Sequence, residues 1–155
     1  STHYTSSAAS DVYKRQKKEG AKVLLGGKRP QGFNKGYFYE PTVFDNVKDN
    51  FTIMNQEPFG PLVPMLSFKT FDEVVERANN NDLGLCSYIY TNSMDKAHRA
   101  SELMETGTVA VNTPAVAIAE APFGGIKQTG YGREGGSMAI KDYLNIKYTH
   151  LGLKS

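Results

Sequence analysis

The chain has 155 residues, of which 39% are hydrophobic and 22% charged, a composition typical of a folded domain. The 18 basic and 16 acidic residues are scattered along it and leave a net charge of +2, which argues against a nucleic-acid or membrane partner. The single cysteine, Cys86, excludes an internal disulfide and a cysteine-based zinc module, and no apolar run could span a bilayer. Residues 1–16 also lack the apolar core of a secretory signal, so we expect a cytoplasmic domain.

Residues 1–16 differ in composition from the rest of the chain. They are small and polar at first, then lead into a lysine-rich stretch without an apolar period. This pattern predicts a disordered or foreign leader over 1–16, with the domain proper over 17–155. The alternative is that 11–19 is the end of a helix whose start lies elsewhere.

Several short segments have the composition of strands. They lie at 23–25, where Gly26 and Gly27 predict a hairpin turn, and at 37–39, 42–44, 62–68, 85–90, 108–111 and 147–153. The segment 62–68 is almost continuously apolar, which predicts a strand covered on both faces.

Helices are expected between the later strands. Thr70 and Glu73 form a capping box ahead of apolar residues at helical spacing, and Ser93 can cap a second helix that ends near Gly107. A shorter helix is expected over 137–144. Strands and helices that alternate in this way predict an α/β fold with a partial, doubly wound parallel sheet.

The loop over 112–130 follows the strand at 108–111. It is mostly apolar and has only two charged residues, Glu120 and Lys127. Because open α/β sheets bind ligands beyond the carboxyl ends of their strands, we expect this loop to line a site.

The other possible motifs favour structural interpretations. Residues 130–135 match the pattern G-x-G-x-x-G, but no strand is predicted immediately before them. We therefore reject a dinucleotide-binding motif at this position. Cys86 and Tyr88 are two residues apart and therefore lie on the same face of a predicted strand. Cys86 is interpreted as a core residue rather than a reactive thiol. His98 is interpreted as a solvated residue, and no histidine has metal-ligand spacing, so no metal site is predicted.

Glu57 and Phe59 lie in the stiff turn EPFGP, immediately before the apolar segment 62–68. A carboxylate held there could accept two hydrogen bonds from vicinal hydroxyls, with an aromatic ring beside them. The alternative is that the turn has only a structural role.

Four segments together resemble the C-terminal part of an aldehyde dehydrogenase. They are EPFGP at 57–61, NNNDLGLCSYIYT at 79–91, GTVAVN at 107–112 and PFGGIKQTGYGREGG at 122–136. The ending DYLNIKYTHLGL is most similar to the succinate-semialdehyde dehydrogenase branch. The resemblance implies part of the catalytic domain of this α/β family, with a C-terminal oligomerisation strand.

The resemblance also implies roles for individual residues. Glu57 and Phe59 match positions that hold the nicotinamide-side ribose of NAD or NADP. Phe123 matches an aromatic residue that lines the aldehyde pocket, and Ala117 and Ile118 match loop positions that tune substrate choice.

Two further implications concern a proton path and assembly. Glu134 matches a glutamate assigned to a proton relay, although an ion pair with a nearby basic residue is an equal alternative. The segment 147–153 resembles an edge strand that pairs with a partner subunit, which implies a homo-oligomer.

The family's reaction needs a cysteine thiolate, a glutamate base and a cofactor domain. The 56 residues before Glu57 contain no cysteine, so the chain resembles a fragment that is inactive alone. The alternatives are a non-catalytic oligomerising α/β interaction module and, less well supported, a stand-alone nucleotide-binding domain. Residues 115–119 offer no hydroxyl, so this loop cannot select a distal carboxylate on the aldehyde.

Overall fold

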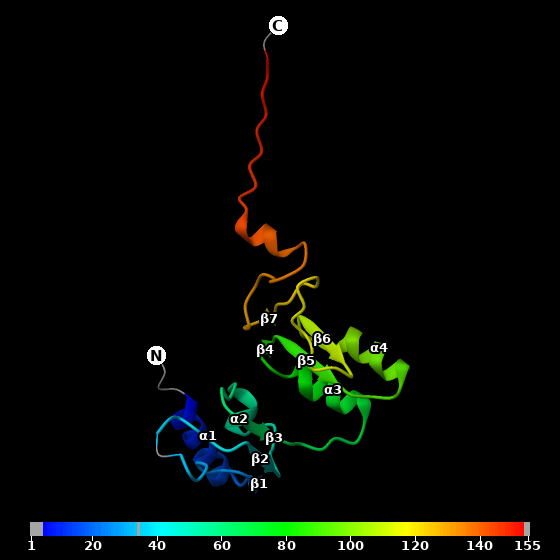
Figure 1. Cartoon of the computed structure of the whole chain (residues 1–155). Helices are drawn as coiled ribbons and strands as arrows, with labels where there is room; N and C mark the ends of the chain where they lie inside the picture. Colours follow the sequence, from blue (N-terminus) through cyan, green and yellow to red (C-terminus); the bar gives the residue numbers. More distant parts are fainter. Residues whose placement is uncertain (1–4, 34, 154–155) are drawn as a thin grey trace. The chain divides into compact units, whose positions relative to one another are not determined.

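The computed structural model describes residues 5–33 and 35–153 of the chain. These residues divide into two compact units, Ser1–Glu73 and Val74–Ser155, coloured blue to teal and green to red in Figure 1. None of the helices in the described residues is long and apolar enough to cross a membrane.

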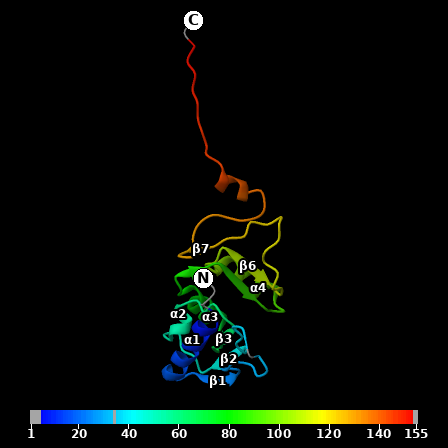
Figure 2. The ribbon, with the colours of Figure 1, turned by 60° about the vertical axis from the view of Figure 1, so that its left-hand side comes forward.

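The first unit combines a three-stranded sheet with two helices. Its elements are α1 (Thr5–Glu19), β1 (Lys22–Leu25), β2 (Thr42–Asp45), α2 (Thr52–Asn55) and β3 (Leu62–Pro64). The central strand, β2, runs antiparallel to β1 and parallel to β3. Helix α1 lies beside this sheet (Figure 2).

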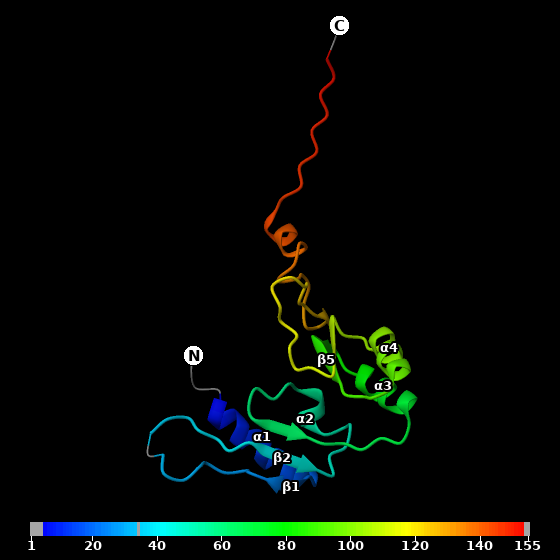
Figure 3. The same ribbon diagram turned by 45° about the vertical axis from the view of Figure 1, so that its right-hand side comes forward.

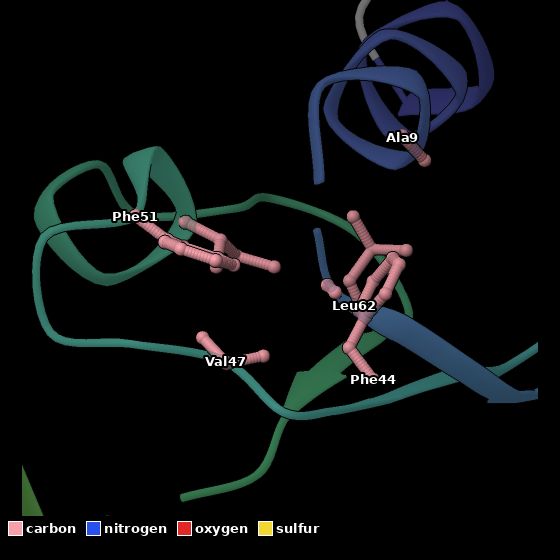
Figure 4. Close-up of a cluster of buried hydrophobic side chains, with 7 residues drawn as sticks. Ala9, Phe44, Val47, Phe51 and Leu62 are labelled. Atoms are coloured by element: carbon pink, nitrogen blue, oxygen red, sulfur yellow. The ribbon is translucent and has the colours of Figure 1, made fainter. Parts of the chain in front are cut away.

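The core of the first unit lies between α1, α2 and the sheet, and Figure 4 shows part of it. Phe44 of β2 is fully buried, and its ring centroid lies 6.1 Å from that of Tyr13 on α1. The buried apolar residues of this cluster are Ala9, Ala21, Phe44, Val47, Phe51, Ile53 and Leu62.

The prediction that residues 1–16 are disordered is wrong for the described part, because residues 5–16 belong to α1. Ala9 is 1% exposed and Gln16 is 0% exposed. These two residues and the half-buried Val12 and Tyr13 have the i, i+3, i+4, i+7 spacing of a helix face. The spacing was missed because alanine and glutamine are weak hydrophobic signals. Residues 1–4 lie outside the described residues.

Two strand predictions in this unit also need correction. Residues 37–39 form no strand. The partner strand of β1, β2, begins only at Thr42, and Leu25 pairs with Val43, so Gly26 and Gly27 do not make a tight hairpin. The strand expected over 62–68 ends at Pro64, and Val63 is 51% exposed rather than covered on both faces. Proline has no N–H with which to continue a ladder, which is consistent with the early end.

The second unit contains two short pairs of strands. Its elements after α3 (Phe71–Asn79) are β4 (Leu83–Gly84), β5 (Cys86–Ile89), α4 (Met94–Leu103), β6 (Thr108–Val111), β7 (Ile126–Lys127) and the 3₁₀ turn η1 (Ala139–Tyr143). Strands β5 and β6 are parallel and connected through α4, whereas β4 and β7 are antiparallel. Helices α3 and α4 lie near β5 (Figure 3).

Both predicted helix caps are confirmed. Thr70 Oγ1 accepts a hydrogen bond from Glu73 N at 3.1 Å, and Glu73 Oε2 accepts one from Lys69 N at 2.8 Å. Ser93 Oγ accepts one from Lys96 N at 3.3 Å. The bonds from Glu73 N and Lys96 N satisfy backbone N–H groups that a helix leaves without internal partners, and the bond from Lys69 N ties the chain before α3 to its first turn.

The mixed α/β class is confirmed, but the parallel sheet is divided. The sequence predicts one sheet from the strands at 62–68, 85–90 and 108–111. In the structure the first of these, β3, pairs with β2, whereas β5 pairs with β6, so the three strands do not form a single sheet. The helix expected over 137–144 is only the 3₁₀ turn η1.

The predicted strand over 147–153 is not formed. This segment pairs with no strand among the described residues, and Figure 1 shows it extended away from the rest of its unit. Its side chains are exposed, and Ile146 just before it is 100% exposed. A strand needs a partner for its backbone groups, and this unit does not supply one here.

Candidate functional site

The first predicted site segment, 57–61, connects α2 to β3 in the first unit. Phe59 is 76% exposed, and Glu57 is also exposed. Among the described residues, no side chain or backbone group donates a hydrogen bond to the Glu57 carboxylate. The carboxylate is therefore open to donors from a ligand.

The backbone of this segment is held at several points. Thr42 N donates to Pro61 O at 2.8 Å, which fastens the segment to β2, and Leu62 N donates to Gly60 O at 2.8 Å. On the other side, Arg15 Nη1 donates to Gln56 Oε1 at 3.4 Å. Helix α1 and the sheet therefore support the turn that presents Glu57.

The second unit pairs two other predicted residues through their backbones. Phe123 N donates to Glu134 O and Glu134 N donates to Phe123 O, both at 2.7 Å. Both residues line a hollow of about 330 Å³. Its lining residues are Leu85, Phe123, Gly124, Gly125, Thr129, Gly130, Tyr131, Gly132, Arg133, Glu134, Asp142 and Tyr143.

Ala117 and Ile118 are exposed and do not line this hollow. Their segment nevertheless runs beside the chain that follows Glu134, because Gly136 N donates to Ala119 O at 2.8 Å. The predicted site-lining loop thus divides into two parts. Its later residues line the hollow, whereas its early residues lie on the surface.

Two residues that sequence reasoning did not assign hold this loop together. The Arg133 guanidinium donates through Nη1 to Gly125 O at 2.9 Å and to Gly132 O at 2.7 Å. Asp142 Oδ2 accepts a hydrogen bond from Arg133 N at 2.9 Å. The motif Arg133-Glu134 was visible in the sequence, but nothing in it indicates that Asp142 is the acceptor.

Lys127 anchors the other end of the loop, where β7 pairs with β4. Its Nζ donates to Asn79 O at 2.8 Å and Asn81 O at 3.0 Å, and forms an ion pair with Glu105 Oε2 at 2.6 Å. Because Asn79 is the last residue of α3, the lysine places a positive charge at the negative end of that helix. A second hollow of about 600 Å³ is lined by Asn79, Asn80, Asn81, Asp82, Lys127, Gln128, Gly130 and Tyr131.

Glu134 is exposed and forms no ion pair with a described residue. The ion-pair alternative for Glu134 therefore receives no support from the described structure. Its backbone is paired with that of Phe123, and the residue is exposed and lines the hollow.

Cys86 is half-buried in β5 and lines neither hollow. Its side chain and that of Tyr88 lie on the same face of the strand, as expected, and a hydrogen bond between them is the main reason why the pKa of Tyr88 is raised. His98 is exposed, in keeping with its interpretation. Within 5–33 and 35–153, no three histidine, cysteine or carboxylate residues gather as a metal site.

Comparisons with known proteins give a consistent result. The model of the aldehyde dehydrogenase family matches residues 5–149, which include most of the segment predicted as a foreign leader. The chain is 47% identical to 3-sulfolactaldehyde dehydrogenase of Pseudomonas putida over 86% of this chain and 27% of that protein. It is 44% identical to mitochondrial succinate-semialdehyde dehydrogenase of Arabidopsis thaliana over 86% of this chain and 25% of that protein.

The fold agrees with solved structures. The NAD⁺ complex of aldehyde dehydrogenase from Bacillus cereus superposes with a TM-score of 0.90 at 41% identity, covering 96% of this chain and 30% of that one. The chain thus spans 27% and 25% of the length of the two curated relatives above. Since the family match extends over nearly the whole chain and the fold matches as well, this chain belongs to the aldehyde dehydrogenase family.

Proposed function

We propose that this chain forms part of the catalytic domain of an NAD(P)-dependent aldehyde dehydrogenase, which oxidises an aldehyde to a carboxylic acid. The observation that carries the proposal is the Glu57 carboxylate, which is exposed and accepts no hydrogen bond from a described residue. It lies near exposed Phe59 on a turn that hydrogen bonds from β2 and α1 hold in place. One structural neighbour is an NAD⁺ complex and another is an NADP-dependent enzyme of E. coli, which supports a nicotinamide dinucleotide as the ligand.

The Glu57 turn fits the sugar of such a cofactor. A carboxylate has enough lone pairs to accept hydrogen bonds from both hydroxyls of a ribose, and such charge-assisted bonds are strong and selective. The ring of Phe59 supplies an apolar surface next to it. The bound dinucleotide would supply the hydride acceptor, and the role of Glu57 and Phe59 is to hold and orient its ribose.

The loop around Phe123 is proposed to act on a small aldehyde. Phe123 gives the substrate pocket an aromatic wall, and Ala117 and Ile118 are proposed to tune which aldehyde is accepted. The absence of a hydroxyl over 115–119 argues against selection of a distal carboxylate by this loop. The exposed Glu134 carboxylate is proposed to relay a proton at the same site.

The nucleophile is proposed to come from outside these 155 residues. A catalytic thiolate must face the substrate, whereas Cys86 lies on β5 beside Tyr88 and lines neither hollow. We therefore expect no aldehyde oxidation by the 155-residue chain alone. The exposed segment 147–153 is proposed to pair with a second subunit in a cytoplasmic homo-oligomer.

The cofactor proposal is tested by titrating NADH and NADPH against the longest natural polypeptide that contains this chain. We expect Glu57→Gln to weaken binding roughly tenfold or more, because hydrogen bonds to a charged acceptor contribute about 1.5–3 kcal/mol each. The matched control is Glu120→Gln, which makes the same chemical change at an exposed position of the second unit. Equal affinity of Glu57→Gln and the unsubstituted protein would contradict the proposed role.

A second candidate function, a non-catalytic oligomerising module, is favoured by the exposed apolar tail. Ile146, Tyr148, Leu151 and Leu153 are all more than four-fifths exposed, from 82% to 100%. This candidate predicts a soluble multimer that binds neither NADH nor NADPH. Size-exclusion chromatography together with the titrations separates the two functions, since cofactor binding lost in Glu57→Gln supports only the enzyme.

A further inference from the structure

Two backbone hydrogen bonds of 2.7 Å join Phe123 and Glu134, the residues at the two ends of the segment 123–134. Such a pair lacks the neighbouring strands that would support it in a sheet, and it is an isolated bridge in the described structure. Its geometry must therefore be maintained by contacts of the residues on either side.

Arg133, next to Glu134, has contacts that can serve this purpose. Its guanidinium crosses the loop to Gly125 O and also bonds Gly132 O. Its backbone N–H donates to Asp142 Oδ2 at 2.9 Å, so the acceptor comes from η1 rather than from the loop itself. The loop is thereby fastened to a separate turn immediately beside the bridge.

Gly132 leaves room for this contact. A Cβ atom at position 132 would lie 2.8 Å from Asp142 Oδ2, and the φ of +94° there is unfavourable for other residues. The carboxylate of Asp142 thus occupies the space that a side chain would fill. A larger residue at position 132 would displace the Asp142 carboxylate, so the contact between Asp142 and the Arg133 amide depends on glycine at this position.

We propose that Asp142 is a positioning residue that holds Phe123 and Glu134 in their paired arrangement through the Arg133 amide. The inference rests on the proposed function only in treating Phe123 as a wall of the aldehyde pocket. Asp142 is exposed and lines the edge of the hollow, so it acts on the pair through Arg133 rather than through burial.

The test compares Asp142→Ala with Asp142→Asn, because asparagine keeps an oxygen acceptor and loses only the charge. We expect alanine to accelerate hydrogen exchange at the Phe123, Arg133 and Glu134 amides roughly three- to tenfold, while asparagine restores most of the protection. Lys141→Ala is the matched control, since Lys141 lies exposed on the same turn and makes no side-chain hydrogen bond among the described residues. A second variant, Gly132→Ala, should displace the Asp142 carboxylate and accelerate exchange at the same three amides.

Activity provides an independent readout in the longest natural polypeptide that contains the chain. We expect Asp142→Ala to raise the aldehyde KM more than it lowers kcat, with rescue by Asp142→Asn. Faster exchange with an unchanged KM would support the positioning role and contradict Phe123 as a substrate wall. Unchanged exchange at all three amides in both Asp142→Ala and Gly132→Ala would overturn the inference.

Discussion

Gly107 offers a sharp test of how the site loop is packed. It lies between α4 and β6, and its N–H donates to Gly84 O at 3.0 Å. A Cβ atom at this position would lie 1.9 Å from Gly124 O and 3.0 Å from Gly125 Cα. The φ of Gly107 is outside the left-handed region, so alanine would be opposed by the contact alone.

The size of the expected effect follows from these distances. The closest ordinary carbon–oxygen contacts are about 3.3 Å, so Gly124 would have to move by roughly 1.4 Å to accept the methyl group. Its neighbour Phe123 is paired with Glu134, so the movement would reach the hollow. Because overpacking against backbone gives little room for relaxation, we expect Gly107→Ala to cost about 3 kcal/mol, the upper end of the usual range.

Urea unfolding of three variants measures this effect. Gly152→Ala is the neutral control, since a methyl group there meets nothing within 4 Å and its φ is not left-handed. Gly130→Ala separates backbone strain from contact, because its φ is +111° and its Cβ would also meet nothing within 4 Å. We expect the lowest urea midpoint for Gly107→Ala and faster exchange at the Phe123 amide. Equal midpoints for Gly107→Ala and Gly152→Ala would refute the packing argument.

Three further predictions concern stability. Phe44→Ala should lower the free energy of unfolding by about 3–5 kcal/mol in urea titrations, because the fully buried ring leaves a cavity. Lys127→Met should cost about 1–2 kcal/mol in the same assay, because two carbonyls and Glu105 lose their partner. The pKa of Glu19 is lowered, chiefly by its hydrogen bond from the Thr52 hydroxyl, so its contribution to stability is present above its unfolded pKa near 4.5 and is lost as the pH falls through its folded pKa. Glu19→Gln should therefore be less stable than the unsubstituted chain at pH 7, and the difference should shrink as the pH falls below 4.5. A difference in urea midpoint that does not shrink as the pH is lowered would contradict this explanation.

Local signals made part of the fold predictable. The caps at Thr70 and Ser93 and the strand at β6 depend on residues within one turn or one short run of the chain. A helix cap is satisfied by atoms within its own turn, and β6 also finds the partner that a strand needs, in β5. The α/β class could be inferred from the alternation of strands and helices, and the family from the four motifs.

The remaining features depend on partners distant in the sequence. Helix α1 was missed because Ala9 and Gln16, which are weak hydrophobic signals in the sequence, become buried only in the folded unit. The strand over 147–153 was expected from composition, yet no described strand pairs with it. Among the site residues, the motifs identified Phe123 and Glu134 separately, but their pairing is made by backbone atoms and carries no side-chain signature.

The burial of α1 has a practical consequence for shortening this chain. Removal of the residues before Lys17 would delete Ala9 and Gln16 and expose the face of Phe44 that packs beside Tyr13. It would also remove Arg15, which bonds Gln56 next to the turn of Glu57. A truncated version would therefore be a poor reagent for ligand-binding studies, since a loss of affinity would reflect a damaged scaffold rather than a missing contact.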